Sequence, residues 1–281
     1  MGEDVFVLPS WLAGELDVAH SLACRSGNDS VKTDLRNIRK QGFTYRVTRE
    51  AAGIERFYET MYLPNVRKTH GERAFVATLD ELMRGCGQGA ELLLVEHGGQ
   101  EVAGVVLGAY DAQRLDALEL GVLGADARLI KGGVLAAIYY FSLQLAAARG
   151  HTRLHLGGAR PFLNDGALRY KSKWGLRITG RLPSMPDRLL LRARMTERAV
   201  ASFLRNNPFV YERAPDVFRI AVFAAEAEQA PPALTERWWR RHPLGGIEGV
   251  TRFRLADGED EALPRLQARH APGREPAGIV Q

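Results

Sequence analysis

Cysteine is scarce in this chain, and its scarcity excludes two kinds of stabilisation. The 281 residues contain only two cysteines, Cys24 and Cys86. Two isolated cysteines cannot make a disulfide framework, and neither belongs to a Cys-x-x-Cys pair or a Cys/His cluster with zinc spacing. We therefore expect reduced thiols, no bound metal and a cytoplasmic location.

A hydrophobic run long enough to cross a membrane is also lacking. The longest uncharged run, from Gly132 to Ala148, is shorter than the roughly 20 apolar residues that a membrane-spanning helix needs. It is interrupted by Ser142 and Gln144, so we predict a buried core helix there. The first residues, MGEDVFVLPSWLAGELD, carry acidic groups early and no basic region before a long apolar core. A secretory signal peptide is therefore not expected.

No block of one charge sign stands out. The formal net charge is +5 and the pI is near 9.3, which is compatible with an anionic small-molecule cofactor. The arginines are spread widely instead of forming one patch, which does not favour nucleic-acid binding. With 46% hydrophobic and 25% charged residues, the composition is that of an ordinary globular protein of one large domain or two small ones.

What the sequence does contain is an alternation of helical and extended patterns. The predicted order is strand 43–48, helix 50–62, helix 78–85, strands 91–97, 101–110 and 114–122, helix 132–149, strand 152–157, helix 165–173, and strands near 176–182 and 188–193. An antiparallel meander thus precedes the long helix and a crossover follows it. This order predicts a mixed α+β fold with a central, mostly antiparallel twisted sheet flanked by helices.

Several local features refine this outline. Val31, Leu35 and Ile38 lie on one face of a helix that Gly42 would end. Pro64 is expected to end helix 50–62, and a polar loop is expected after it. The last two strands of the order above read as a hairpin around 183–186. After them we expect a helix with Val200, Phe203 and Leu204 facing inward, and a strand FRIAVFAAE.

The expected domain organisation has four parts. Residues 1–31 form an N-terminal extension, 32–195 the central domain, and 196–226 a helix and strand packed on it. Residues 227–281 read as a linker, a short helix and a mobile tail. Within them, Trp238 to Arg241 could touch a membrane surface or an acyl chain, but packing of a terminal helix is the favoured interpretation.

A Gly-Gly turn opens the stretch on which the functional prediction depends. It lies between Arg128 and the long helix, in the sequence RLIKGGV. A helix N-terminus presents free N–H groups to an anion. The backbone of Gly132, Gly133 and Val134, with Lys131 beside it, could therefore hold a pyrophosphate.

These features resemble the GNAT acyltransferases, and more narrowly their FemAB-related group. The resemblance is carried by the Gly132-Gly133 helix start, the strand LHLGG, and the pattern Asn164-x-x-Ala167-x-x-Tyr170-x-x-x-Trp174-Gly175. It covers about residues 32–195. The chain departs from the family's Arg/Gln-x-x-Gly-x-Gly/Ala signature, because Lys131 stands where its first glycine would fall.

The resemblance implies a GNAT-like fold and an N-acyltransferase. Its donor would be acetyl-CoA or a longer acyl-CoA, its partner a small-molecule amine, and the reaction a direct attack in a ternary complex without a metal. Two alternatives stay open: a FemAB-like aminoacyltransferase that uses aminoacyl-tRNA, and a binding module of the same fold that has lost catalysis.

The same resemblance suggests catalytic residues. Tyr170 would protonate the leaving thiolate, although a helix aromatic can simply pack on a core. Glu119, on the strand before the turn, is a candidate base, but its side chain could equally face solvent. His70, in the segment THGER, is the other candidate base, since a histidine pKa suits neutral pH, but a lone loop histidine is usually just solvated.

Other polar residues are candidate binding groups. Arg128 stands at the Arg/Gln position of the family's signature, so the resemblance makes it a candidate for binding the donor. Asn164 could position the pantetheine or the acceptor. Asn164 and Asp165 could instead cap the helix that follows them. His155, Arg160 and Lys171 are candidates for the substrate or its phosphates, against the alternatives of a satisfied core histidine and ordinary surface charge.

Overall fold

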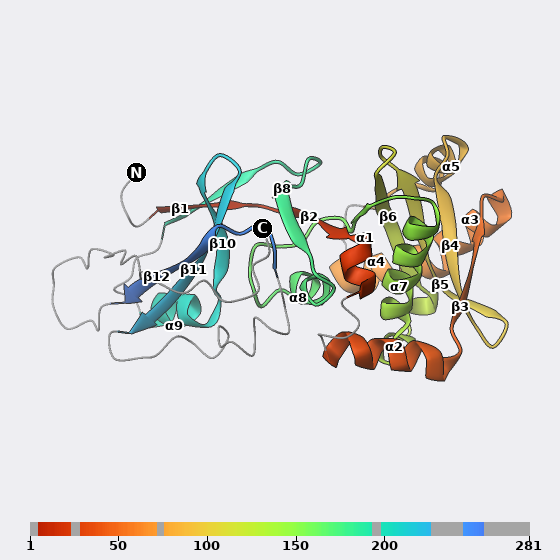
Figure 1. Cartoon of the computed structure of the whole chain (residues 1–281), viewed down its shortest axis with the longest axis horizontal. Coiled ribbons are helices and arrows are strands. Elements are labelled where there is room, and N and C mark those ends of the chain that lie inside the picture. The colour runs from red at the N-terminus through yellow and green to blue at the C-terminus, as the bar shows by residue number, and fades with distance from the viewer. Residues whose placement is uncertain (1–4, 24–28, 72–75, 193–197, 226–243, 256–281) are drawn as a thin grey trace. The chain divides into compact units, whose positions relative to one another are not determined.

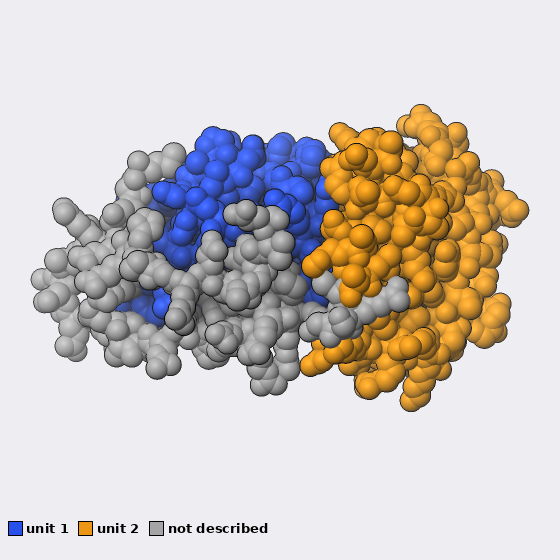
Figure 2. Space-filling model, viewed as in Figure 1, with its two compact units in different colours: residues 1–15, 158–281 blue, residues 16–157 orange. Residues whose placement is uncertain are grey.

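The computed structural model describes residues 5–23, 29–71, 76–192, 198–225 and 244–255 (Figure 1). The chain divides into two compact units, which Figure 2 colours separately. Unit 1 comprises residues 1–15 and 158–281, and unit 2 comprises residues 16–157. Each unit is described by itself.

Five neighbouring strands of one sheet form the centre of unit 2. Its strands, in the order in which they pair, are β3 (Thr44–Thr48), β4 (Glu91–His97), β5 (Gln100–Ala109), β6 (Arg114–Val122) and β7 (Arg153–His155). The first four pair antiparallel, and β6 pairs with β7 in parallel. This is the meander and crossover that the sequence predicts, so the predicted mixed α+β architecture is confirmed.

One helical layer packs on this sheet through the long helix α7 (Val134–Ala148), which contacts β4, β5, β6 and β7 (Figure 1). Ten of its residues are buried, which is why its sequence is almost uncharged. The helices α1 (Val18–Ala23) and α2 (Asp29–Gln41) pack against α7. In α2 the buried residues are Val31 and Ile38, as its apolar spacing predicts.

A second helical layer is built from one almost continuous helical segment and α5 (Leu79–Gly87). The segment consists of α3 (Ala51–Phe57), the π-helix η2 (Tyr58–Tyr62) and α4 (Leu63–His70). Its apolar side chains pack with Leu92, Leu94 and Val106 of the sheet. Thr78 begins α5 with a capping box, because its hydroxyl accepts from the N–H of Glu81 while the Glu81 carboxylate accepts from the N–H of Thr78.

Pro64 does not end its helix, so the prediction of a polar loop directly after it is wrong. The residues up to His70 are helical. The physical reason is that Pro64 lies in the first turn of α4, immediately after the π-helix, where a missing N–H costs little.

Unit 1 is built from short strands around an aromatic cluster. A three-stranded sheet contains β10 (Phe209–Ala214), β11 (Val217–Ala225) and β12 (Gly249–Leu255), and β1 (Val5–Pro9) pairs with β9 (Arg188–Arg192). The ring of Phe6 packs edge-on against Phe209, Tyr211, Phe223 and Phe253. The helix α9 (Arg198–Asn206) buries Leu204, but Phe203 is 48% exposed and the prediction that it faces inward is wrong.

The remaining elements of unit 1 include the helix α8 (Gly166–Ser172). The strand β8 (Arg177–Arg181) pairs with β2 (Leu12–Asp17), and β9 pairs with β1, so the predicted hairpin between β8 and β9 is wrong. The strands themselves lie where they are predicted. Their partners come from the N-terminus, more than 160 residues earlier, which a local pattern cannot reveal.

None of the helices within the described ranges is long and apolar enough to span a membrane. The predicted linker near 226–233, Trp238 to Arg241, and the tail beyond Leu255 lie outside the described residues.

Candidate functional site in unit 2

The parallel strands β6 and β7 pair only at their beginnings. Arg114, Leu115 and Asp116 of β6 lie opposite Arg153, Leu154 and His155 of β7. Beyond the pair Asp116–His155 the described strands form no further ladder. The ladder between the two strands therefore ends where β7 ends, while β6 continues to Val122.

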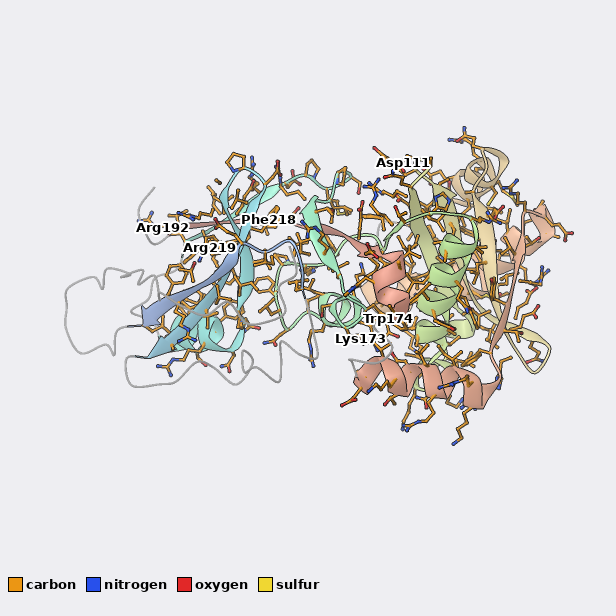
Figure 3. All side chains as sticks on the ribbon, in the orientation of Figure 1. Asp111, Lys173, Trp174, Arg192, Phe218 and Arg219 are labelled. Atoms are coloured by element: carbon orange, nitrogen blue, oxygen red, sulfur yellow. The ribbon has the colours of Figure 1, made fainter. Side chains whose placement is uncertain are left out.

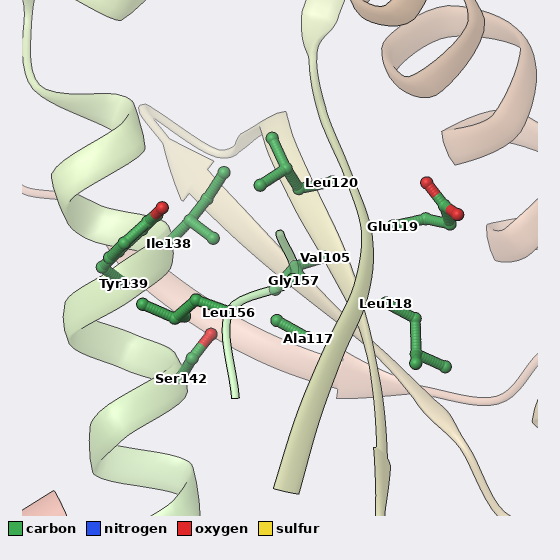
Figure 4. Close-up of a pocket in the computed structure, with 10 residues that line it drawn as sticks. All are labelled: Val105, Ala117, Leu118, Glu119, Leu120, Ile138, Tyr139, Ser142, Leu156 and Gly157. Atoms are coloured by element: carbon green, nitrogen blue, oxygen red, sulfur yellow. The ribbon is translucent and has the colours of Figure 1, made fainter. Parts of the chain in front are cut away.

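A cavity of about 60 Å³ lies where this ladder ends (Figure 4). Its walls come from β6, from α7 and from the chain just after β7, with Val105 of β5 beneath. The lining residues are Val105, Ala117, Leu118, Glu119, Leu120, Ile138, Tyr139, Ser142, Leu156 and Gly157. The Ser142 hydroxyl is buried and has no hydrogen-bond partner among the described residues, so a ligand that enters the cavity would meet this polar atom on the α7 wall.

A β-bulge in β6 decides which way its side chains point. Val105 of β5 lies opposite Leu120, whereas Leu107 lies opposite Ala117, so β6 contains one more residue than β5 between these pairs. The extra residue breaks the alternation. Figure 4 shows Leu118 and Glu119 on the side of β6 that faces away from α7, with Ala117 and Leu120 on the other side.

Burial raises the pKa of Glu119 above the ordinary range of a carboxyl group. A hydrogen bond from the Tyr62 hydroxyl acts in the opposite direction, and the negative charge of Glu81 raises the pKa further. A half-buried carboxylate whose pKa is raised is better suited to accept a proton near neutral pH than a solvated one. Among the predicted site residues, Glu119 thus has the surroundings expected of a base.

The Gly-Gly turn lies between a short helix and α7. The short helix α6 (Ala127–Lys131) ends at Gly132, and Gly133, with φ of 100°, precedes the first residue of α7. The N–H groups of Gly132 and Gly133 already donate to the carbonyl oxygens of Arg128 and Ile130. The N–H groups without an intrahelical partner therefore begin at Val134, in the first turn of α7.

The two basic residues of this turn are both exposed to solvent. The Arg128 guanidinium forms an ion pair with Asp126 at 2.8 Å, and that carboxylate raises the pKa of Arg128. Lys131 is exposed and directly precedes the two glycines. Lys131 thus has the more accessible charge of the two.

His155 is a buried residue at the end of β7. Its Nδ1 accepts a hydrogen bond from the N–H of Gly157 at 3.3 Å and lies 3.9 Å from a carboxylate oxygen of Asp116. These contacts place His155 at the last paired position before the strands separate. They also give it the local partners of a structural histidine.

The candidate residues of unit 1 have local structural partners. Asp165 caps α8 through the N–H of Leu168, and Asn164 donates to the carbonyl oxygen of Asn206. Asp165 is thus the helix cap, one of the two roles weighed for this pair. The side chain of Lys171 is buried and donates to the carbonyl oxygen of Gly158 at 2.6 Å, which is the position of a structural lysine.

Tyr170 lies on α8 and is half-buried. The ammonium group of Lys173, labelled in Figure 3, lies 3.8 Å from the centre of its ring. Arg160 is exposed and stacks over the ring of Trp11 at 5.5 Å. The side chain of His70 lies outside the described part of the structure. The predicted residues are therefore divided between two units, and only Glu119 borders the cavity.

A protein-family comparison identifies this arrangement. The family described as an acetyltransferase (GNAT) domain matches residues 25–172, which is more than half of the chain. The chain belongs to this family of GNAT acetyltransferases. It is therefore an acyltransferase with the GNAT fold, and the predicted resemblance to the GNAT acyltransferases, the fold class and the enzyme class are confirmed.

Solved structures similar to this GNAT protein include three whose titles name a protein. L-PGS from Bacillus licheniformis is 11% identical, with a TM-score of 0.42 over 56% of this chain and 49% of its own. FemX is 13% identical, with a TM-score of 0.45 over 63% and 60%. Ard1 from Thermoplasma volcanium is 21% identical, with a TM-score of 0.35 over 47% and 81%.

These structural likenesses support no argument about function, because every TM-score is below 0.5. This chain also spans only about half the length of the L-PGS chain. No curated protein matches the sequence. Within the described ranges, no group of three or more His, Cys, Asp or Glu side chains is placed to hold a metal ion.

The sequence alone does not point to Tyr62 or Ser142 as residues of interest. Tyr62 belongs to the predicted helix 50–62 and carries no motif, and Ser142 is only an interruption of an apolar run. A weak signal existed for Ser142, since it is one of two polar residues in that run. For Tyr62 there was none, because its contact with Glu119 depends on a π-helix that no spacing rule predicts.

Proposed function

We propose that this protein is an N-acyltransferase that moves an acetyl or longer acyl group from acyl-CoA to an amine by direct attack in a ternary complex. The observation that supports this most strongly is the cavity between the diverging ends of β6 and β7, with Glu119 beside it at the bulge. The opening would admit the thioester end of the donor, and the bulge presents the carboxylate on the opposite face of β6.

The donor's pyrophosphate would lie at the start of α7. The first-turn N–H groups from Val134 onward point at that position, and the helix dipole favours an anion there. Gly133 supports the turn through its positive φ, and Gly132 completes it. Lys131 is available for a phosphate, and Arg128 could join it if Asp126 released its guanidinium.

The reaction would proceed by one nucleophilic addition and one elimination. Glu119 takes a proton from the acceptor's ammonium group, and the free amine attacks the acyl carbonyl carbon. A C–N bond forms, the C–S bond breaks, and the thiolate takes a proton, for which the sequence predicts Tyr170 as the donor. The second proton of the amine nitrogen leaves to solvent, and solvent returns a proton to Tyr170. The enzyme forms no covalent intermediate, and the amide and free CoA leave.

The other predicted residues have supporting roles in this proposal. His70 is the alternative base. His155 would fix the end of β7 beside the cavity, and Arg160 would contact the acceptor. Asn164 would lie near the donor or the acceptor, with its amide held by Asn206. The division into parts at 31, 195 and 226 and the cytoplasmic location remain predictions from the sequence.

Ligand-induced stabilisation tests the donor. A ligand that binds only the native state raises its melting temperature. We expect acetyl-CoA and CoA to raise the melting temperature of the wild type and a Lys131→Ala, Arg128→Ala double variant to respond less. A tRNA-specific response that weakens with salt would instead favour an aminoacyl-tRNA donor.

A product screen then tests the activity. Acyl-CoA donors of increasing chain length would be incubated with a pool of amines, with thiol release and product mass as the readouts. We expect thiol release that depends on an added amine and an amide product of matching mass. Binding of CoA without any amide product would favour a binding module that has lost catalysis.

A further inference from the structure

We propose that Tyr62 is the positioning residue for Glu119, and that one extra residue in the helical segment before β4 brings it there. This inference rests on the proposed role of Glu119 in accepting the acceptor's proton. It assigns a function to the π-helix η2, which the proposed reaction does not otherwise use.

The first observation is the local geometry of η2. The N–H of Leu63 donates to the carbonyl oxygen of Tyr58, five residues earlier instead of four. Single π-turns inside α-helices are rare, and those that occur are often found at functional sites. One additional residue in a turn rotates everything after it by about 100° relative to a continuous α-helix. Tyr62 is the last residue of this turn, and its backbone approaches β6 at Gly121.

The second observation is the close approach of η2 to β6. A side chain at Gly121 would place its Cβ 2.5 Å from the main-chain carbon of Met61 and from the nitrogen of Tyr62. Only glycine allows two backbones to lie this near. Gly121 is two residues after Glu119, so the two positions share one face of the strand. The contact that requires Gly121 thus brings Tyr62 to the face that carries Glu119.

The third observation is how the Tyr62 hydroxyl is held. The side chain is 1% exposed, and its oxygen accepts a hydrogen bond from the N–H of Ala77 at 2.9 Å. The same hydroxyl lies close enough to the Glu119 carboxyl to interact with it, and this interaction lowers the pKa of Glu119.

The charges around Glu119 define what removal of the hydroxyl should do. The groups that interact with the carboxyl are Tyr62 of η2 and Glu81 of α5, and Tyr58 of η2 acts on Tyr62. Burial and Glu81 raise the pKa of Glu119, whereas the Tyr62 bond lowers it. Loss of the hydroxyl therefore shifts the pKa of Glu119 upward.

The decisive comparison is Tyr62→Phe against Tyr58→Phe. Both changes remove one hydroxyl from the same π-helix, but only the Tyr62 hydroxyl acts on the Glu119 carboxyl. We expect Tyr62→Phe to move the acid limb of the pH profile of kcat/KM upward and to lower kcat about tenfold or more, with the KM for the donor unchanged. Tyr58→Phe should leave all three quantities as in the wild type.

A titration of the Glu119 carboxyl carbon by NMR, in the wild type and both variants, makes the test independent of turnover. An upward shift in Tyr62→Phe alone supports the proposal, and equal values in all three proteins overturn it. If the wild type turns over no donor, the proposed function fails, while the NMR titration still decides the role of Tyr62.

A second pair of variants tests the backbone approach. Gly121→Ala should push η2 away from β6 and raise the pKa of Glu119 as Tyr62→Phe does. Gly108→Ala is the control, because its Cβ would meet the end of the exposed Leu118 side chain at 3.3 Å and the Cβ of Ala90 at an ordinary 3.7 Å. An unchanged pKa in a folded Gly121→Ala variant would contradict the proposal.

Discussion

At the scale of single residues, the surroundings of Glu119 differ from those of the other candidate residues. Arg128 is paired with Asp126, Asn164 with a main-chain carbonyl, and Lys171 is buried against another. Glu119 instead combines burial, a like charge and one hydrogen-bond donor, and it borders the cavity. Such a carboxyl group can change its protonation state within the pH range in which enzymes work.

Replacement of Glu119 by Gln is the direct test of this residue. The amide keeps the size of the side chain but cannot accept the amine's proton, so we expect kcat/KM to fall by roughly 10²–10⁴-fold. In the wild type the activity should rise with pH through the raised pKa of Glu119, and this acid limb should disappear in Glu119→Gln. A rate profile measured from pH 5 to pH 9 checks both outcomes.

Leu118→Ala is a matched control for that variant, because the bulge places Leu118 on the same face and its side chain is 52% exposed. It should retain the acid limb. A Glu119→Gln enzyme with an unchanged profile would exclude Glu119 as the base and direct attention to His70.

At the scale of elements, the start of α7 combines a structural and a binding requirement. Gly133 has a φ of 100° and Gly150, just after the other end of α7, has a φ of 79°. At either position a residue with a Cβ would have a strained backbone, but its Cβ would not clash severely with neighbouring atoms. The two glycines differ in that only Gly133 adjoins the N–H groups proposed to hold the donor.

This pair allows strain to be separated from binding. Gly133→Ala and Gly150→Ala should each lower the free energy of unfolding by about 1 kcal/mol, because alanine is disfavoured at positive φ. Only Gly133→Ala should also weaken the binding of CoA, as measured by calorimetry. Equal CoA affinities in the two variants would indicate that the pyrophosphate lies elsewhere.

The elements also show what a sequence pattern can and cannot predict. Strands β4, β5 and β6 and the helices α2, α7 and α8 lie where their apolar spacing predicts them, because burial on one face imposes the period. The strand β2 is not predicted, because its sequence LAGELD does not alternate between apolar and polar residues. The helix α4 is not predicted, because a proline such as Pro64 usually ends a helix. Glu119 could be nominated from its strand, but its direction depends on a bulge that only pairing with β5 reveals.

At the scale of the whole molecule, one buried cation links the fold to pH. Lys171 is 6% exposed, and burial lowers its pKa from 10.5 to about 8, with Asp165 acting weakly in the opposite direction. Between these two values the unfolded chain holds a proton on Lys171 that the folded protein lacks. The stability contributed by this residue therefore rises as the pH increases from 8 to 10.5.

The change Lys171→Met removes that titration while it keeps a long side chain. The shift of about 2.5 pKa units corresponds to about 3 kcal/mol. We expect the free energy of unfolding of the wild type, relative to Lys171→Met, to increase by up to this amount between pH 7 and pH 10.5. Urea unfolding at both pH values measures it, and a constant difference would contradict a lowered pKa.

The π-turn in η2 and the bulge in β6 are each a single-residue insertion, one in a helix and one in a strand. Removal of the extra residue from η2 would turn Tyr62 away from Glu119, and removal of the extra residue from β6 would turn Glu119 away from Tyr62. The helix and the strand could each form without its insertion. The two insertions should therefore be gained or lost together in evolution. In an alignment of relatives, a one-residue gap near Tyr62 should be accompanied by a one-residue gap near Leu118, and the sequences that carry both gaps should use a different proton acceptor.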